Sequence, residues 1–334
     1  MNKQKDLLVS VVVIDYKKNN PYLIECLDAL QKQTYKHFEI ILETDHPKKI
    51  KYPHLKIIDY QGKYIPPANK RDHGAEVAKG DIIAFIDDDA YPNPNWLASI
   101  VRHFSKKDIV AVGGPGVTPP GVSWQEEASG WASASPFGSG FYYYRFLAGA
   151  KKYVDDFPSM NLSIRRTDFL SVGGFDSNYW PGEDTKLCLD LVNKTGKRII
   201  YDPKTIVYHH RRLLWRGHLR QNGNFGLHRG FFAKVLPQTS LRPLYMLPSL
   251  MDIGLVLLLL SFFVNSSLFS LIRQTGLFFL CLYILSLVVN SVWISKRSQS
   301  IFQGLVSIPA IFLTHSWYGL KFMEGFFFTA KLKR

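Results

Sequence analysis

The stretch Gly80-Asp81-Ile82-Ile83-Ala84-Phe85-Ile86-Asp87-Asp88-Asp89 decides the fold class of this chain. Its apolar run is short enough for a strand buried inside a parallel sheet, and it ends abruptly in three carboxylates. Ligands of open α/β sheets bind outside the carboxyl ends of the strands, and these acids lie at such an end. Three adjacent carboxylates repel one another unless a cation or hydrogen-bond donors neutralise them.

Two interpretations of these acids are open at this stage. Mg²⁺ typically takes one or two protein carboxylates and completes its coordination with water and substrate phosphates, which suits a metal–diphosphate site at the tip of a central strand. The alternative is a polar turn in which an Asp caps a helix that follows Pro92 or Pro94. The rest of the chain favours the metal site.

Other segments of the N-terminal half repeat a strand–helix pattern. Asn20 is suited to cap a helix that has Pro21 at its first position. Apolar runs predict strands at residues 9–14, 38–42, 55–58 and 161–164. Helices are predicted at residues 67–79, closed by Gly80, at 94–104 and at 183–193, ended by Gly196. This alternation predicts an α/β fold with a doubly wound, mostly parallel sheet.

Composition narrows the functional classes. The chain has 334 residues, a formal net charge of +14 and three distant cysteines that fit neither a disulfide framework nor a zinc site, which suits a reducing compartment. Basic charge indicates nucleic acid, an anionic membrane face or anionic substrates. Nucleic-acid binding is disfavoured because the basic residues flank apolar C-terminal segments. Residues 7–14 are interpreted as a strand and not a signal peptide, so the N-terminal domain is expected in the cytoplasm.

Two further segments, residues 113–153 and residues 211–234, each have more than one possible role. Residues 113–153 are rich in Gly, Pro, Ser and aromatic residues, and they would form either the wall that receives a second substrate or an aromatic core patch. Residues 211–234 carry Arg and His without an acid, which indicates phosphate binding, contact with anionic lipid headgroups, or a solvated face that only sets membrane orientation.

The C-terminal segments are long and apolar enough to enter a membrane. Spans are predicted at about 244–264 and 268–292, with a possible third at 301–318 and an interfacial tail at 319–334. We therefore divide the chain into a catalytic domain, 1–236, and a membrane domain, 237–334. The bias of Lys and Arg toward the cytoplasmic side places the catalytic domain on that side of the inner membrane.

Several ordered motifs together resemble the family 2 glycosyltransferases, which have a GT-A fold. The segments that carry the resemblance are residues 9–16, 39–45, 68–80, Phe85-Ile86-Asp87-Asp88-Asp89, Val172-Gly173-Gly174-Phe175-Asp176, Gly182-Glu183-Asp184 and Val207-Tyr208-His209. They cover roughly residues 8–212. The chain departs from the family pattern at Ile14-Asp15, where Pro-Thr is usual, at Thr44, where an acid is usual, and at Asp72, where Asn is usual.

The resemblance implies a nucleotide-diphospho-sugar donor and a divalent cation, Mg²⁺ or Mn²⁺. Asp87 and Asp89 would hold the metal against the diphosphate, and His209 would be a further ligand or a diphosphate donor. Asp88 would face the ribose.

The remaining donor contacts are implied in the same way. Asp15 and Tyr16 would make the first nucleotide contacts, and Asp45 would accept a hydrogen bond from the base. Arg71 would lie beside the base or diphosphate, with Asp72 next to it.

On the acceptor side, the resemblance implies that Asp184 is the general base and that Glu183 orients it or shares the task. The alternative is that both are first-turn acids that favour a helix N-terminus. Arg211 and Arg212 are candidates to bind the diphosphate or a lipid headgroup. A Gln-x-x-Arg-Trp motif, typical of processive synthases in this family, is not found, and residues 214–221 do not fit it.

The sequence therefore predicts a metal-dependent, inverting transferase that moves one sugar to a hydroxyl of a lipid-linked or glycan acceptor at the cytoplasmic membrane face, in cell-surface polysaccharide or glycoconjugate synthesis. One alternative is a membrane protein with a degenerate transferase site that binds nucleotide sugars. Another is a metal-dependent enzyme that makes or breaks phosphoanhydrides.

Overall fold

The computed structural model describes residues 6–332, and the chain divides into two compact units. The first unit contains the residues up to Pro119 together with Tyr144–His210. The second contains Pro120–Tyr143 and, among the described residues, 211–332. The functional division into 1–236 and 237–334 stays a prediction, and the compact units have different boundaries from it.

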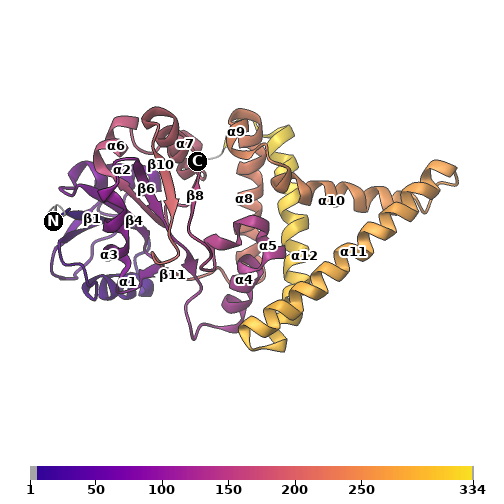
Figure 1. Ribbon diagram of the computed structural model, residues 1–334, viewed down its shortest axis with the longest axis horizontal. Coiled ribbons are helices and arrows are strands. Elements are labelled where there is room, and N and C mark those ends of the chain that lie inside the picture. The colour runs from indigo at the N-terminus through magenta and orange to yellow at the C-terminus, as the bar shows by residue number, and fades with distance from the viewer. Residues whose placement is uncertain (1–5, 333–334) are drawn as a thin grey trace. The chain divides into compact units, whose positions relative to one another are not determined.

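The first unit is built on a mixed, mostly parallel sheet in the order β3-β2-β1-β4-β9-β6-β10-β8 (Figure 1). The strands are β1 (Val9–Asp15), β2 (Phe38–Thr44), β3 (Leu55–Asp59), β4 (Ile82–Asp87), β6 (Ile109–Gly113), β8 (Lys152–Val154), β9 (Asn161–Arg165) and β10 (Arg198–Tyr201). Strands β3, β2, β1 and β4 run parallel, whereas β9 is antiparallel to both β4 and β6. The predicted fold class is confirmed.

Helices cover this sheet, and their ends follow the local signals in the sequence. They are α1 (Pro21–Gln31), α2 (Pro67–Val77), α3 (Trp96–Val101), η1 (Arg102–Ser105), α6 (Arg166–Val172), η3 (Ser177–Tyr179) and α7 (Glu183–Thr195). The Asn20 side chain caps α1 by accepting from the N–H of Tyr22, as predicted. Helix α7 ends at Gly196 in the left-handed conformation, also as predicted.

Gly80 has a different role from the predicted one. Helix α2 ends at Val77, and Ala78 is already extended, so Gly80 does not close the helix. The Gly80 N–H instead donates to the Ser10 hydroxyl at 2.8 Å, and a Cβ at position 80 would lie 2.6 Å from the Ser10 nitrogen. A glycine is needed here because the chain passes so close to β1 as it enters β4.

A small second sheet in the first unit explains how residues distant in sequence meet. Its order is β5 (Ala90–Pro92), β11 (Val207–His209) and β7 (Gly116–Val117). Strand β11 runs antiparallel to β5, with His209 opposite Ala90. This register brings residue 209 beside the acids that end β4.

The second unit is helical. It contains α4 (Trp124–Ala134), α5 (Pro136–Ser139), α8 (Arg216–Val235), α9 (Pro237–Ser240), α10 (Pro243–Leu260), α11 (Ser267–Ser298), α12 (Ile301–Met323) and η4 (Glu324–Phe328), while η2 (Gly140–Arg145) links the units. Part of the 113–153 segment is thus helical, and its Trp124 and Trp131 rings pack edge-on against Phe302 and Trp293. Trp124 is nevertheless 43% exposed, and the choice between a wall for a second substrate and an aromatic core patch stays a prediction.

Two helices of the second unit, α10 and α11, are long and apolar enough to cross a membrane, and 22% of each apolar stretch is buried. They correspond to the two predicted spans, with α11 extending to Ser298. The third predicted segment forms α12, which continues to Met323, so the predicted interfacial tail begins inside that helix. Whether α12 spans a membrane stays a prediction.

Candidate active site

The acids of the first unit converge because their strands are parallel neighbours. Asp15 ends β1, Asp45 follows β2, and Asp87 ends β4. Carboxyl ends of adjacent parallel strands meet at one edge of the sheet, which is where such folds bind their ligands. The structure thus places three of the predicted site residues along one edge.

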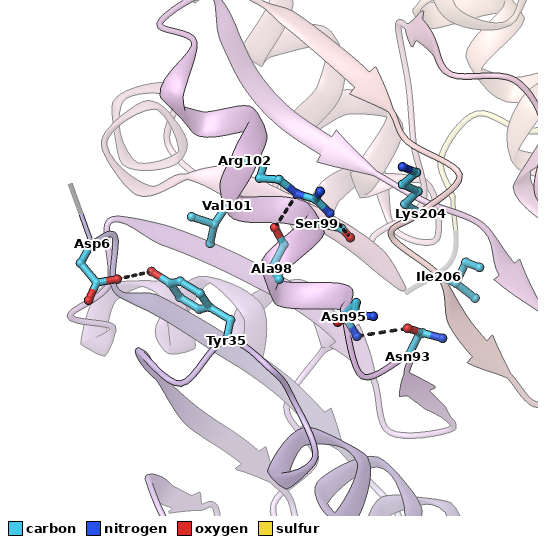
Figure 2. A pocket seen from close by; sticks show the side chains of 10 residues that line it. All are labelled: Asp6, Tyr35, Asn93, Asn95, Ala98, Ser99, Val101, Arg102, Lys204 and Ile206. Carbon is cyan, nitrogen blue, oxygen red and sulfur yellow. Dashed lines mark hydrogen bonds between the residues drawn. The ribbon is translucent and has the colours of Figure 1, made fainter. Parts of the chain in front are cut away.

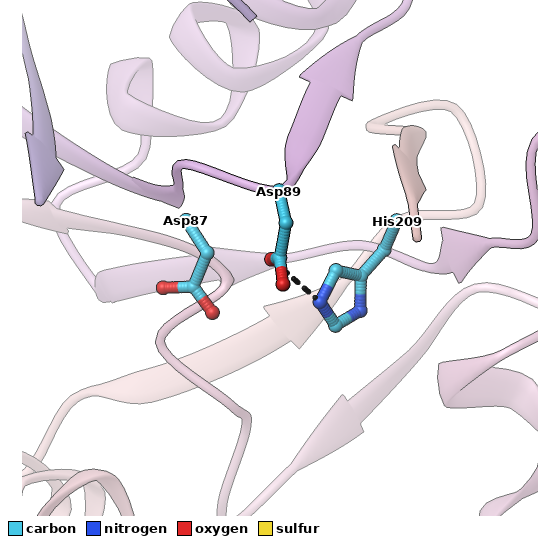
Figure 3. A group of neighbouring side chains, drawn as sticks. All are labelled: Asp87, Asp89 and His209. Atoms are coloured by element: carbon cyan, nitrogen blue, oxygen red, sulfur yellow. Dashed lines mark hydrogen bonds and ion pairs between the residues drawn. The ribbon is translucent and has the colours of Figure 1, made fainter. Parts of the chain in front are cut away.

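The strongest candidate for a metal site is the cluster of Asp87, Asp89 and His209 (Figure 3). One ligand atom from each residue lies within 4.8 Å of the others, and His209 Nε2 is 3.1 Å from Asp89 Oδ1. Two carboxylates and an imidazole form a donor set that suits a divalent cation such as Mg²⁺ or Mn²⁺. The residues present therefore fit the implied metal.

Asp88, which lies between the candidate metal ligands Asp87 and Asp89 in the sequence, is buried. Its Oδ2 accepts from Asn20 Nδ2 at 2.6 Å, and the same amide nitrogen is 3.2 Å from Asp15 Oδ1. Burial raises the pKa of Asp88 to about 8, and the nearby charges of Asp89, Asp87 and Asp15 add to this effect. Through Asn20, Asp88 therefore ties the end of β4 to the end of β1, and only 6% of the residue is exposed to solvent.

Asp15 and Asp45 are each held by a lysine. Lys48 Nζ lies 3.0 Å from Asp15 Oδ2, and Lys70 Nζ lies 2.8 Å from Asp45 Oδ1. Burial alone would raise the pKa of Asp15, but hydrogen bonds from Lys48, Thr44 and Asn20 outweigh it and lower that pKa. Tyr16, by contrast, is 49% exposed beside them. The structure thus gives Asp15 and Asp45 protein partners and leaves Tyr16 open to a ligand.

Arg71 connects the strand-end acids to the acids of α7. Its Nη2 lies 2.9 Å from Asp87 Oδ1 and its Nη1 lies 3.1 Å from Glu183 Oε1. The guanidinium carbon lies 5.6 Å from the centre of the Phe175 ring. Arg71 therefore bridges the candidate metal site and the predicted catalytic helix.

The two predicted catalytic acids open α7. Burial raises the pKa of Glu183 to about 7, with Arg71 acting in the opposite direction and Asp184 adding to the increase. Asp184 Oδ1 accepts from the Thr185 N–H at 2.8 Å, and its Oδ2 accepts from the Ser159 N–H at 3.4 Å. The more exposed Asp184 is thus oriented by backbone donors, whereas the buried Glu183 is paired with Arg71.

Asp72 supports the turn in front of α7. Its Oδ1 accepts from the Phe175 N–H at 2.8 Å, next to Gly174, whose φ is +70°. A Cβ at position 174 would lie 2.5 Å from Asp72 Oδ1, so the glycine allows this approach. In this structure Asp72 holds the turn, and its predicted contact with the nucleotide stays a prediction.

Arg211 and Arg212 belong to the second unit. The Arg211 N–H donates to Glu126 Oε1 at 3.0 Å. Their predicted contact with a diphosphate or a lipid headgroup stays a prediction.

Sequence reasoning missed three supporting residues, Asn20, Lys48 and Lys70. Asn20 was assigned only a capping role, although its Nδ2 also reaches two carboxylates. Lysine is rarely buried, yet Lys70 is only 2% exposed and pairs with Asp45. Its position directly before Arg71 in α2 was the available signal.

A separate hollow of about 900 Å³ lies on the first unit (Figure 2). Its lining residues are Asp6, Tyr35, Asn93, Asn95, Ala98, Ser99, Val101, Arg102, Lys204 and Ile206. Asp6 and Tyr35 precede β1 and β2, so this part of the hollow lies at the amino ends of the parallel strands. None of the strand-end acids lines it, and it is distinct from the candidate active site.

Comparison with known proteins agrees with this geometry. Residues 10–170 match the model of the glycosyl transferase family 2. A solved mannosyltransferase from Pyrobaculum calidifontis, in complex with GDP-Man and Mn²⁺, superimposes with a TM-score of 0.59 at 17% identity, covering 92% of this chain and 87% of that one. This likeness supports a GT-A-like fold for the chain.

Two curated relatives extend the match. A glucosyl-dolichyl phosphate glucuronosyltransferase of Haloferax volcanii is 28% identical over 224 residues, which cover 60% of this chain and 68% of the relative. A pre-mycofactocin glycosyltransferase of Mycobacterium tuberculosis is 29% identical over 162 residues, which cover 48% of this chain and 33% of the relative. The family model and these relatives together support a family 2 glycosyltransferase.

Proposed function

We propose that this chain is a divalent-metal-dependent, inverting glycosyltransferase that moves one sugar from a nucleotide-sugar donor to a hydroxyl of a lipid-linked acceptor. The observation that carries the proposal is the cluster of Asp87, Asp89 and His209, joined through Arg71 to the acids of α7. A cation site suits the donor diphosphate, and a carboxylate at a helix start suits removal of a proton from the acceptor.

On the donor side, Asp87, Asp89 and His209 would hold Mg²⁺ or Mn²⁺, which when bound neutralises charge on the departing nucleoside diphosphate. The exposed ring of Tyr16 would pack against the nucleoside. Lys48 would keep Asp15 ionised, and the two lysines would hold Asp15 and Asp45 in place at the rim of the nucleotide site.

On the acceptor side, Asp184 would accept the proton of the acceptor hydroxyl as that oxygen forms its bond to the anomeric carbon. The bond between this carbon and the diphosphate oxygen breaks in the same step, and the electron pair leaves with the nucleoside diphosphate. One such displacement inverts the configuration. Glu183, held by Arg71, would fix the first turn of α7 relative to the donor site.

A lipid-linked acceptor at the cytoplasmic membrane face is supported by three observations. Helices α10 and α11 are apolar and mostly exposed. Lys296 and Arg297 lie in the last turn of α11, and basic residues also precede α10, so two crossings would keep both basic segments on the cytoplasmic side. The name of the Haloferax relative includes a dolichyl phosphate. A role in cell-surface polysaccharide or glycoconjugate synthesis would follow.

The test is turnover by the full chain in detergent. A panel of nucleotide sugars is supplied with Mg²⁺ or Mn²⁺ and a membrane lipid extract, and release of nucleoside diphosphate is measured for wild type, Asp89→Ala and Asp184→Asn. Lipid-dependent release with one donor, abolished by chelation of the metal and lost in both variants, is expected.

Other outcomes would favour the alternatives. Release that needs no lipid and survives Asp184→Asn would refute the base assignment and favour a phosphoanhydride enzyme. Metal-dependent donor binding without turnover, across extracts that contain a range of lipid-linked saccharides, would favour a degenerate binding protein.

A further inference from the structure

Two arginines and two tyrosines gather in the second unit, where α8 and α9 adjoin the start of α10. The rings of Tyr142 and Tyr245 stack with their centres 5.0 Å apart and their planes 7° from parallel. The guanidinium carbon of Arg229 lies 4.9 Å from the centre of the Tyr245 ring. Arg242 Nη1 donates to the Tyr142 hydroxyl at 3.4 Å. The stacked rings thus have a guanidinium group associated with each of them.

Arg229 is fixed within this cluster. The residue is 7% exposed, and its Nη1 donates to the Ser240 hydroxyl at 3.2 Å. A guanidinium stays charged at every physiological pH, so burying it places a permanent positive charge here. The Tyr318 side chain packs on the same apolar cluster as Tyr245, and its buried hydroxyl has no hydrogen-bond partner among residues 6–332. The site therefore combines fixed positive charge with an unused hydroxyl.

Arg242 adds a second positive charge in a position that favours an anion. It is the residue before α10, and Pro243 takes the first position of that helix. A helix N-terminus carries a positive partial charge, so a cation there is unfavourable and an anion is favourable. Two guanidinium groups and a helix N-terminus therefore act in the same direction. Guanidinium groups are the side chains best matched to phosphate oxygens.

The place of the cluster in the chain indicates where the phosphate comes from. Helix α10, which begins at Pro243, is the first of the two helices that are long and apolar enough to cross a membrane. Tyrosine and arginine side chains at the end of such a helix lie at the depth of the lipid headgroups. A phosphate attached to a membrane lipid would reach this depth with its chain along the apolar helices.

We propose that Arg229, Arg242 and the Tyr142–Tyr245 pair bind the phosphate at the head of an isoprenoid membrane lipid. The choice of an isoprenoid lipid rests on the proposed function, because such a lipid would carry the acceptor. The phosphate site itself rests on the contacts of this cluster. It would hold the acceptor lipid by a group that takes no part in the transfer.

The experiment measures binding by native mass spectrometry of the full chain in detergent, with no nucleotide sugar present. The probes are a C15 isoprenyl monophosphate, the matching C15 isoprenyl alcohol, and inorganic phosphate as a competitor. We expect the monophosphate to bind at least about tenfold more tightly than the alcohol, since charge-assisted hydrogen bonds to the phosphate are lost in the alcohol.

Arg242→Gln is expected to lower the affinity for the monophosphate by about tenfold. Lys234→Gln, which removes an exposed charge from α8, is the matched control and should change it by less than about twofold. Equal thermal melting of the two variants and wild type shows that both are folded. Tyr142→Phe, which removes the hydroxyl next to Arg242, should weaken binding by about threefold.

Three results would overturn the proposal. Equal binding of the alcohol would mean that only an apolar surface is recognised. Equal losses in Arg242→Gln and Lys234→Gln would mean diffuse surface charge. Displacement by inorganic phosphate at the concentration of the lipid would assign the site to free phosphate. Sugar transfer is assayed separately, so a chain that binds the monophosphate but transfers no sugar contradicts the proposed function alone.

Discussion

Two pairs of acids in the first unit differ in the backbone that presents them. Asp87 and Asp89 end a buried strand and meet His209, whereas Glu183 and Asp184 open α7. A helix start supplies N–H donors and a positive partial charge, and Asp184 accepts from the N–H of Thr185. The strand end brings like charges together, which a cation would neutralise. The same residue type is therefore suited to metal binding in one place and to proton transfer in the other.

Arg71 couples the strand-end acids to the acids of α7, so the two pairs are not independent. It contacts Asp87 and Glu183 through separate nitrogens of one guanidinium group. A planar side chain with several donors can make both contacts at once, and a lysine cannot. The comparison thus predicts separate roles with one shared support.

The largest expected effect is on metal binding. Asp89→Ala should lower the affinity for Mn²⁺ by at least about 100-fold, because a ligand is removed from a three-residue cluster. Asp184→Asn is the matched control and should stay within about twofold of wild type. Free Mn²⁺ measured by electron paramagnetic resonance checks both. Equal losses in the two variants would show that the acids form one metal site.

The next largest effect is expected for Arg71, which bridges Asp87 and Glu183. Arg71→Lys should lower kcat/KM for transfer by about 10- to 100-fold, since one of the two charge-assisted contacts is lost. Arg166→Lys is the control, because the described hydrogen bonds of the Arg166 side chain go only to backbone carbonyls of α2, at 3.3 Å. Steady-state kinetics of both variants give the comparison. An unchanged kcat/KM in Arg71→Lys would make the two acid pairs independent.

A smaller effect, on the free energy of unfolding, is expected for Asn20, which supports the acids Asp15 and Asp88. Asn20→Ala removes a cap and the N–H groups that reach Asp15 and Asp88, so the free energy of unfolding should fall by about 2 kcal/mol. The exposed Asn95→Ala should cost less than about 0.5 kcal/mol. Urea denaturation followed by circular dichroism measures both. A loss in Asn20→Ala no larger than in the control would contradict the bridging role.

The smallest effect is a pH dependence at the turn before α7. Burial raises the pKa of Asp72 to about 7 from 3.8, so the folded chain binds the proton more tightly than the unfolded chain does. Stability from this group is complete below about pH 4 and is lost as pH rises through about 7. Asp72→Asn cannot titrate but can still accept from the Phe175 N–H. Because Asp72 is only partly buried, solvent screens part of this shift, and the variant should gain about 1 kcal/mol relative to wild type between pH 5 and pH 8.

Melting of both proteins at the two pH values provides the measurement. Donor KM separates the two roles considered for Asp72: a change of more than about threefold in Asp72→Asn would favour the predicted nucleotide contact over support of the turn. A stability difference that does not vary with pH would mean that Asp72 has an ordinary pKa.

Local patterns were sufficient for much of the first unit. The apolar run before Asp87 predicted β4, and Asn20 followed by Pro21 predicted the start of α1. Gly196 ended α7 as expected because only a residue that tolerates positive φ fits there. Each of these features depends on neighbours within a few residues, so no tertiary information was needed.

Gly80 shows where local reasoning fails. A glycine shortly after a helix was interpreted as its terminator, yet its function is to pass close to Ser10 on β1. The helices of the second unit show the same limit. Helix α8 has no clear apolar stripe in its sequence, because glycines at 223, 226 and 230 let α12 approach its backbone. Such close packing leaves little periodic signal.

The sequence by itself determined the family resemblance, through its ordered motifs. It also determined the strand–helix alternation, the acids at the end of β4 and the apolar C-terminal helices, because each of these depends on a contiguous run of residues. The resemblance already implied that His209 is a further ligand beside Asp87 and Asp89. Only the tertiary structure decided how β11 brings His209 there, that Asn20 links Asp15 to Asp88, and that Arg71 reaches Glu183. These contacts join residues up to 120 positions apart. They exist because parallel strands end at one edge and β11 returns beside β5, and no local pattern encodes that return.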